Sequence, residues 1–253
     1  MNPGSAMRRA DWSLEPSVPH SAAAAASEDS TRVVSPICPS VTVRRAVSPA
    51  DIDTARRLQA EVYLARHYIE PSDMVDGLIG VHLDPWVASS VYFVAVDPDG
   101  MPLAVSRQIS ARRVDQLPTM ALGGLDPEVT AQLCRQGDDG VVEISALAVR
   151  PGAPNGTATL LYAGMWEHSR RRLHTAWVMA VHPVVWTHLN TSLGPVLEAF
   201  GPTLWYLGSN VVPAVLWTDT TATTIAGYVP ESPSPRRQGL VSLFPASVAR
   251  RVR

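Results

Sequence analysis

The sequence predicts one α/β domain in which helices flank a mixed β-sheet. Over residues 41–219, apolar segments of strand length alternate with segments whose apolar residues recur at helical spacing. Residues 97–100, Asp-Pro-Asp-Gly, separate two of these strands with the turn chemistry of a β-hairpin. Residues 141–168 then join an apolar strand to a helix through a loop of small residues. Together these features indicate a single sheet covered by helices.

The individual elements follow from the same signals, taken in chain order. A helix is expected from residues 49–51 to about residue 68, because Ala55, Leu58 and Val62 recur at helical spacing. Pro71-Ser-Asp73 opens a second, short helix. The remaining helices are expected at residues 127–135, 158–168 and 184–193, and the strands at 41–47, 90–96, 102–109, 141–149, 175–181, 203–207 and 212–217.

The composition is that of a soluble globular protein. The 253 residues are 46% hydrophobic with a formal net charge of −2, which does not favour a nucleic-acid binder or a membrane-surface binder. No apolar run approaches the roughly 18 residues that a membrane span needs. Cys38 and Cys134 form neither a disulfide framework nor a metal-ligand pattern, and no histidine pair has the spacing of a zinc site. We therefore expect a cytoplasmic protein without a metal.

Both ends of the chain differ in composition from the centre. Residues 1–40 are rich in Pro, Ser and Ala, and such a segment buries too little apolar surface to offset its ordering entropy. Residues 230–253 combine a Ser-Pro linker with a basic tail. The predicted organisation is thus a disordered leader (1–40), one folded domain (41–229), and a linker with tail (230–253).

The junction between strand and helix at residues 149–158 is a candidate phosphate site. Helix N-termini expose unpaired backbone N–H groups and partial positive charge, and Arg150 stands where the strand ends. Neither a Gly-Lys-Ser/Thr loop nor a Gly-x-Gly-x-x-Gly fingerprint is present; indeed all 21 basic residues are arginine. An ordinary Pro/Gly turn between a buried strand and a helix remains the alternative.

Short motifs in this order resemble a known family. The chain resembles GNAT-type acyltransferases, in the branch of acyl-homoserine-lactone (autoinducer) synthases and long-chain N-acyl amino acid synthases. The resemblance spans about residues 41–219 and depends on Glu61-Val-Tyr-Leu64, Arg107, Leu117-Pro-Thr119, Glu143-Ile-Ser-Ala-Leu-Ala-Val149, Val181-His-Pro183 with Trp186, and the run 205–219.

The resemblance implies a mostly antiparallel sheet whose fourth and fifth strands splay apart to admit the pantetheine arm of an acyl thioester. The gap would lie between residues 147–150 and 179–182. The residues implied to bind the donor are Leu147, Val149 and Arg150, together with Asn155, Gly156 and Thr157 of the phosphate loop, which also contains Gly152. A backbone N–H near residues 147–149 would stabilise the oxyanion of the tetrahedral intermediate.

The resemblance also implies catalytic roles for three side chains. Glu143 would remove a proton from the attacking amine, directly or through water, and Ser145 would orient that carboxylate or the acyl carbonyl. His182 would relay a proton to or from the leaving thiol. Each has a structural alternative: a buried hydrogen-bond network for Glu143, a locally satisfied hydroxyl for Ser145, and a turn residue for His182.

The acceptor amine is expected near Asp84 and Trp86, with Arg107 pairing an acceptor carboxylate. Equally, Arg107 is a candidate ion-pair partner of Glu143 or Asp84. An apolar lining for the acyl chain is expected from tryptophans, although aromatic residues at such spacing are more often plain core. The tryptophans considered are Trp166, Trp177, Trp186, Trp205 and Trp217.

Two departures from the family limit the transfer of function. Ala146 and Gln59 stand where the family usually has arginine, which argues against S-adenosylmethionine as acceptor. The phosphate loop is also unlike that of acetyl-CoA users, which favours a carrier-protein phosphopantetheine over CoA. The predicted function is therefore transfer of a medium or long acyl chain from acyl carrier protein, or from CoA, to the amine of an amino acid or related small amine, with the donor as co-substrate and no resident cofactor. The alternatives are an acetyl-CoA-dependent acetyltransferase and a catalytically degenerate thioester-binding protein.

Overall fold

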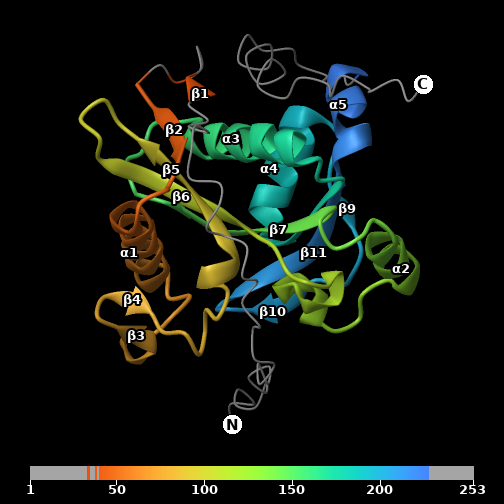
Figure 1. Ribbon diagram of the computed structural model, residues 1–253, viewed down its shortest axis with the longest axis horizontal. Helices are drawn as coiled ribbons and strands as arrows, with labels where there is room; N and C mark the ends of the chain where they lie inside the picture. The colour runs from red at the N-terminus through yellow and green to blue at the C-terminus, as the bar shows by residue number, and fades with distance from the viewer. Residues whose placement is uncertain (1–32, 35–37, 39, 228–253) are drawn as a thin grey trace.

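The computed structural model describes residues 33–34, 38 and 40–227, and its centre is one nine-stranded sheet (Figure 1). Along the sheet the strands follow the order β1-β2-β5-β6-β7-β8-β11-β10, with β9 pairing β11. Their bounds are β1 Val33–Val34, β2 Thr42–Arg45, β5 Ser90–Val96, β6 Pro102–Ile109, β7 Val141–Val149, β8 Ala176–Val181, β9 Glu198–Ala199, β10 Leu204–Tyr206 and β11 Ser209–Trp217. The expected mixed sheet and the hairpin at residues 97–100 are confirmed.

Every pairing in the sheet is antiparallel except that between β7 and β8. These two parallel strands pair only from Val141 opposite Ala176 to Glu143 opposite Val178. Beyond that point β7 continues to pair with β6, and β8 continues to pair with β11. The fourth and fifth long strands therefore splay apart, as the family resemblance implies.

A β-bulge in β7 lies next to this separation. Arg107 of β6 is opposite Ser145, whereas Val105 is opposite Ala148, so β7 contains one extra residue between these pairs. Ala146 within the bulge has φ 58°, a left-handed conformation that is uncommon for alanine. The Ser106 hydroxyl donates a hydrogen bond of 2.9 Å to the Ser145 carbonyl and so fixes the bulge from the neighbouring strand.

Helices cover both faces of the sheet (Figure 1). Helix α1 (Pro49–Ala65) is capped by the Ser48 hydroxyl and buries Leu58 and Val62 against β5 and β6 on one face. Helix α3 (Thr157–Arg172) covers the opposite face, where Leu160, Leu161 and Trp166 are fully buried. The remaining helices are α2 (Pro127–Arg135), α4 (Pro183–Leu193) and α5 (Thr218–Gly227).

Four expectations about the elements need correction. Residues 71–73 form only one 3-10 turn, because the chain enters the short hairpin β3–β4 (Met74–Val75 and Leu78–Ile79) directly afterwards. Strand β11 begins at Ser209, three residues before the expected start, and continues into helix α5, which the sequence analysis missed. The sheet also begins before residue 41, since β1 of the expected leader pairs with β2. The rest of that leader and the tail from residue 228 lie outside the described residues.

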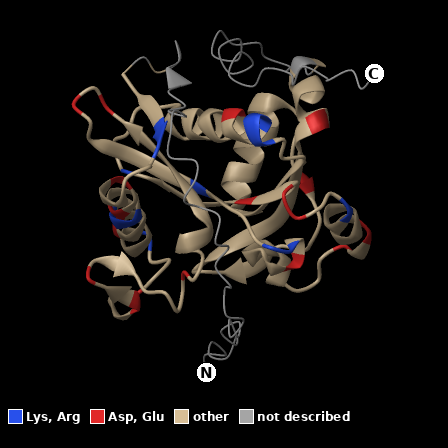
Figure 2. Cartoon of the chain, in the orientation of Figure 1, with Lys and Arg blue, Asp and Glu red and all other residues tan. Residues whose placement is uncertain are grey.

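Charged residues of both signs lie close together on α1 and at the C-terminal end of α3 (Figure 2). In α3, Glu167 accepts hydrogen bonds of 3.1 Å from both Arg170 and Arg171. Within residues 40–227 no helix has the length and hydrophobicity to cross a bilayer, and no cluster of side chains has the composition of a metal site.

Candidate active site

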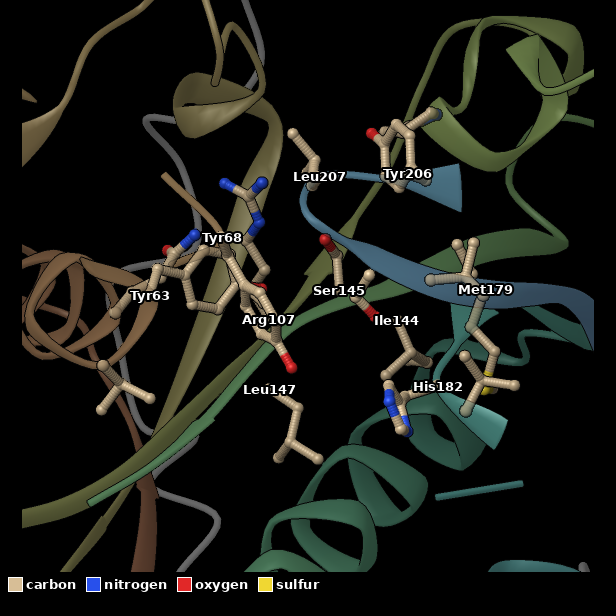
Figure 3. Close-up of a pocket in the computed structure, with 18 of the residues that line it drawn as sticks. Tyr63, Tyr68, Arg107, Ile144, Ser145, Leu147, Met179, His182, Tyr206 and Leu207 are labelled. Atoms are coloured by element: carbon tan, nitrogen blue, oxygen red, sulfur yellow. The ribbon is translucent and has the colours of Figure 1, made fainter. Parts of the chain in front are cut away.

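The separation of β7 and β8 opens into a cavity of about 530 Å³. One wall comes from β7, with Ser145 and Leu147 among its lining residues, and the facing wall comes from Met179 of β8 and His182 beyond its end (Figure 3). Glu143 and Val178 are the last paired residues, so Ile144 and Met179 form the apex of the wedge. The predicted gap between residues 147–150 and 179–182 is thus present and open.

The cavity extends through the sheet from one face to the other. On the α1 face it is lined by Gln59, Tyr63 and Arg66, and on the α3 and α4 face by Tyr162 and Val184. In Figure 3, Tyr63, Tyr68 and Arg107 lie on one side of β7, and Met179 and His182 on the other. The polar side chains therefore concentrate at the α1 end, and the other end is mainly apolar.

The β10–β11 hairpin completes the cavity on the α1 side. Tyr206, Leu207 and Ser209 line it, and the tip of the hairpin lies against the end of α1. A Cβ on Gly208, whose φ is 75°, would stand 2.7 Å from the carbonyl oxygen of His67, so only glycine allows this approach.

Asp84, Trp86 and Arg107, the predicted acceptor residues, all line this cavity. Arg107 Nη1 donates to Asp84 Oδ2 at 2.8 Å and to the Tyr92 hydroxyl at 3.1 Å, and both charged side chains are buried. Of the alternatives left open by the sequence, Arg107 pairs with Asp84 and not with Glu143. Among the described residues, Asp84 Oδ1 and Arg107 Nε have no hydrogen-bond partner. Each of the two ions therefore has a fully buried polar atom without a partner among the described residues.

Glu143 is buried beside the cavity without lining it. Its Oε2 accepts a hydrogen bond of 2.7 Å from the backbone N–H of Thr119, and its neighbours Ile144 and Ser145 are the residues that reach the cavity. Burial raises the pKa of the Glu143 carboxyl to about 8, an effect that the Thr119 N–H and the Arg107 charge only partly oppose. A carboxyl with such a pKa is suited to exchange protons near neutral pH.

His182 both lines the cavity and begins helix α4. Its Nδ1 accepts a hydrogen bond of 3.2 Å from the backbone N–H of Val184. In the neutral ring the proton then resides on Nε2. The structural role that sequence analysis left open is present, and it orients the ring beside the open end of the wedge.

The residues implied to bind the donor phosphate lie outside the cavity. Arg150 donates to Glu61 Oε2 on α1 at 2.8 Å. Gly156 has φ 95° at the N-terminus of α3, and the Thr157 hydroxyl donates to the Pro154 carbonyl. Asn155 is exposed, and a Cβ on Gly152 would meet open space. Their binding of a phosphate stays a prediction, which depends on backbone N–H groups more than on Arg150.

The expected tryptophan lining is wrong. Trp166 and Trp177 pack edge to face in the core with ring centroids 5.7 Å apart, whereas Trp205 is exposed. Because core burial and cavity lining require the same apolar pattern, sequence spacing does not separate them. The aromatic rings that line the cavity are instead those of Trp86 and of four tyrosines that sequence analysis missed as site residues: Tyr63, Tyr68, Tyr162 and Tyr206.

Solved structures share this architecture. The chain is similar to LasI, an acyl-homoserine-lactone synthase (TM-score 0.56, 16% identity, covering 81% of this chain and 100% of that one). FeeM, an N-acyl amino acid synthase from uncultured soil microbes, matches with a TM-score of 0.54 and 14% identity over 73% of this chain and 94% of FeeM. The chain has the fold of these synthases.

A third solved structure with this fold is BjaI, a CoA-dependent acyl-homoserine-lactone synthase in complex with S-adenosylmethionine and isopentyl-CoA. It matches with a TM-score of 0.52 and 14% identity over 77% of this chain and 92% of BjaI. No protein-family model and no curated protein matches the sequence. The resemblance stated from the motifs is thus confirmed at the level of the fold.

Proposed function

We propose that the protein is an N-acyltransferase that moves a medium or long acyl chain from a pantetheine thioester to the amine of an amino acid or related small amine. The observation that carries this proposal is the open wedge between β7 and β8, which joins an apolar space to a buried polar site. Its volume of about 530 Å³ lies within the range of small-molecule sites. The fold shared with FeeM and LasI supports the same reaction class.

The wedge offers the backbone chemistry that acyl transfer needs. After Glu143 the edge of β7 that faces β8 has no strand partner, so its N–H groups are open to a ligand. The pantetheine arm would lie along this edge, and an N–H near residues 147–149 would donate to the thioester carbonyl as it becomes an oxyanion. One such donor is worth about 3 kcal/mol of transition-state stabilisation.

The acceptor amine would enter from the α1 face. The unused Oδ1 of Asp84 would accept a hydrogen bond from the amine nitrogen, and Glu143 would receive the proton lost as the new C–N bond forms. Because Glu143 lies behind the cavity wall, this transfer needs a bridging water or a small movement of Ser145. The departing thiolate would take a proton from solvent, while the Nε2–H of His182 would donate a hydrogen bond to it.

Acyl carrier protein is the proposed donor and partner, with acyl-CoA as the alternative. A carrier's phosphopantetheine brings a single phosphate, which suits a loop that supplies α3 N–H groups while Arg150 is held by Glu61. BjaI, which shares the fold, is CoA-dependent, and for this reason both donors belong in the test.

The test measures free thiol and amide product with octanoyl, palmitoyl and acetyl donors, each on CoA and on carrier protein, in the presence of a pool of amines. Thiol release and an octanoyl or palmitoyl amide are expected. Release with acetyl-CoA alone would replace the proposal with an acetyltransferase. Donor binding without thiol release would replace the proposal with a non-catalytic thioester-binding protein. Gln59 and Ala146, which stand in the cavity wall where the family usually has arginine, are consistent with that alternative.

A further inference from the structure

Gln59 of α1 is a buried polar side chain that the protein itself leaves unused. It is 4% exposed and lines the α1 end of the cavity. Its amide offers two N–H groups and a carbonyl oxygen, yet no group in the described part of the chain hydrogen-bonds to it. Gln108, also buried, uses its amide nitrogen to donate to the Met165 carbonyl and to the Ser169 hydroxyl, although its Oε1 has no partner among the described residues. Because the Gln59 amide lines the cavity, the partner expected for it is a ligand bound there.

The charges around this site determine which ligand it suits. The charge of Arg107 is compensated by Asp84 at 2.8 Å, and the unpaired atoms of this ion pair are the acceptor Asp84 Oδ1 and the donor Arg107 Nε. The other arginine of the described lining, Arg66, is exposed, where ion pairs are weak and screened. A carboxylate placed in the buried part would therefore lie beside the Asp84 carboxylate without an uncompensated cation. A ligand with an amine and an uncharged polar group avoids this charge repulsion and the cost of burying an unpaired carboxylate.

We infer that the acceptor is a primary amine whose neighbouring group is an uncharged hydrogen-bonding group, such as a carboxamide or a hydroxyl, and that Gln59 recognises this group. The inference rests on the proposed acyl transfer and narrows its acceptor class. Asp84 Oδ1 accepts from the amine, while the Gln59 amide both donates to and accepts from the neighbouring group. Glutamine suits a carboxamide well, because each amide supplies one donor and one acceptor to the other.

The experiment compares leucinamide, leucinol and leucine as acceptors of the octanoyl group, with kcat/KM expressed per unprotonated amine. Wild type is expected to prefer leucinamide over leucine by at least about tenfold, because a hydrogen-bonding site left unpaired discriminates strongly. Gln59→Leu should lower this ratio severalfold and leave the part that the Asp84 carboxylate causes, and Gln59→Arg should reverse the ratio by supplying a cation. Amine pKa differences cancel when ratios are compared between variants.

The control is Gln132→Leu on α2, an exposed glutamine that does not line the cavity, which should keep the wild-type ratio. Gln59→Glu keeps the size of the side chain, so it replaces Gln59→Leu in the test if the leucine variant does not fold. In Gln59→Glu the ratio of kcat/KM for leucinamide to that for leucine should fall, because leucinamide activity is lost. Equal use of leucine and leucinamide by wild type, or an unchanged ratio in the Gln59 variants, would overturn this inference and leave acyl transfer standing. Absence of thiol release with every amine would instead overturn the proposed function.

Discussion

The buried carboxyl of Glu143 makes the stability of the protein depend on pH in a predictable direction. In the unfolded chain this group titrates near 4.5, and burial raises its pKa to about 8 in the folded protein. Between these values the folded state keeps a proton that the unfolded state has lost. The stabilisation that comes from this bound proton is therefore fully present below pH 4.5 and is lost as pH rises toward 8. The difference between 4.5 and about 8 corresponds to about 5 kcal/mol.

Glu143→Gln should remove this dependence. The glutamine has the same size, stays neutral, and its amide oxygen can still accept the Thr119 N–H. Urea unfolding of both proteins at pH 5, 6, 7 and 8, followed by the fluorescence of buried Trp166 and Trp177, gives the free energy of unfolding at each pH. Relative to Glu143→Gln, the free energy of unfolding of the wild type should fall by several kcal/mol between pH 5 and 8.

The matched control is Glu61→Gln, because the Glu61 carboxyl is 58% exposed and pairs with Arg150. It should change the free energy of unfolding by less than about 1 kcal/mol at every pH. If wild type and Glu143→Gln instead run parallel from pH 5 to 8, the carboxyl does not hold its proton in the folded state and the reasoning fails. The same titration should appear in catalysis: kcat/KM should rise with pH to an inflection near 8, and Glu143→Gln should lose turnover while it keeps donor binding.

Two further predictions concern buried polar networks. Asp84→Asn leaves the charge of Arg107 buried without its partner, so it should lower the free energy of unfolding by about 3–5 kcal/mol. Addition of Arg107→Gln to this variant should recover part of the loss. A loss below about 1 kcal/mol in urea unfolding would show that water already solvates the pair. The Ser169 hydroxyl lies 2.8 Å from the Gln108 amide nitrogen and 2.7 Å from the Trp177 ring nitrogen. Ser169→Ala leaves both donors buried and should cost about 2–4 kcal/mol by the same measurement, whereas an unchanged midpoint would mean that they find other acceptors.

The sequence predicted the helices and strands better than it predicted the residues that line the cavity between them. Strands 90–96 and 102–109 were placed at their observed bounds, because an apolar run and a turn of Asp, Pro and Gly are local signals. The family resemblance predicts Asp84 and Arg107 at the acceptor site; both line the cavity, and their pairing was one of two open alternatives. Tyr68 and Tyr206 were missed, since they come from separate loops and hairpins and meet only in the folded chain.

Arg150 shows the limit of placing a side chain by its position alone. At the end of β7 and before a helix, an arginine suits a phosphate, but Glu61 of α1 lies within 2.8 Å of it. Glu61 is 89 residues earlier in the chain, so no local sequence pattern predicts this contact. The Glu61 carboxyl is 58% exposed, which keeps the ion pair weak, and a bound phosphate would compete for the Arg150 guanidinium.

The opening between β7 and β8 has a cause that neither strand shows alone. Each strand satisfies one edge with an antiparallel neighbour along its length, so loss of the β7–β8 pairing after Glu143 exposes only the facing edges. The extra residue at Ala146 bends β7 at this point, and its left-handed φ of 58° costs about 1–2 kcal/mol that glycine would avoid. An alanine carries no sequence signal for a bulge, and a separated strand is as apolar as a paired one. The geometry on which the proposed acyl transfer depends is therefore a tertiary property. Ser106 of β6 fixes the bulge, and the space beside it is left for a ligand.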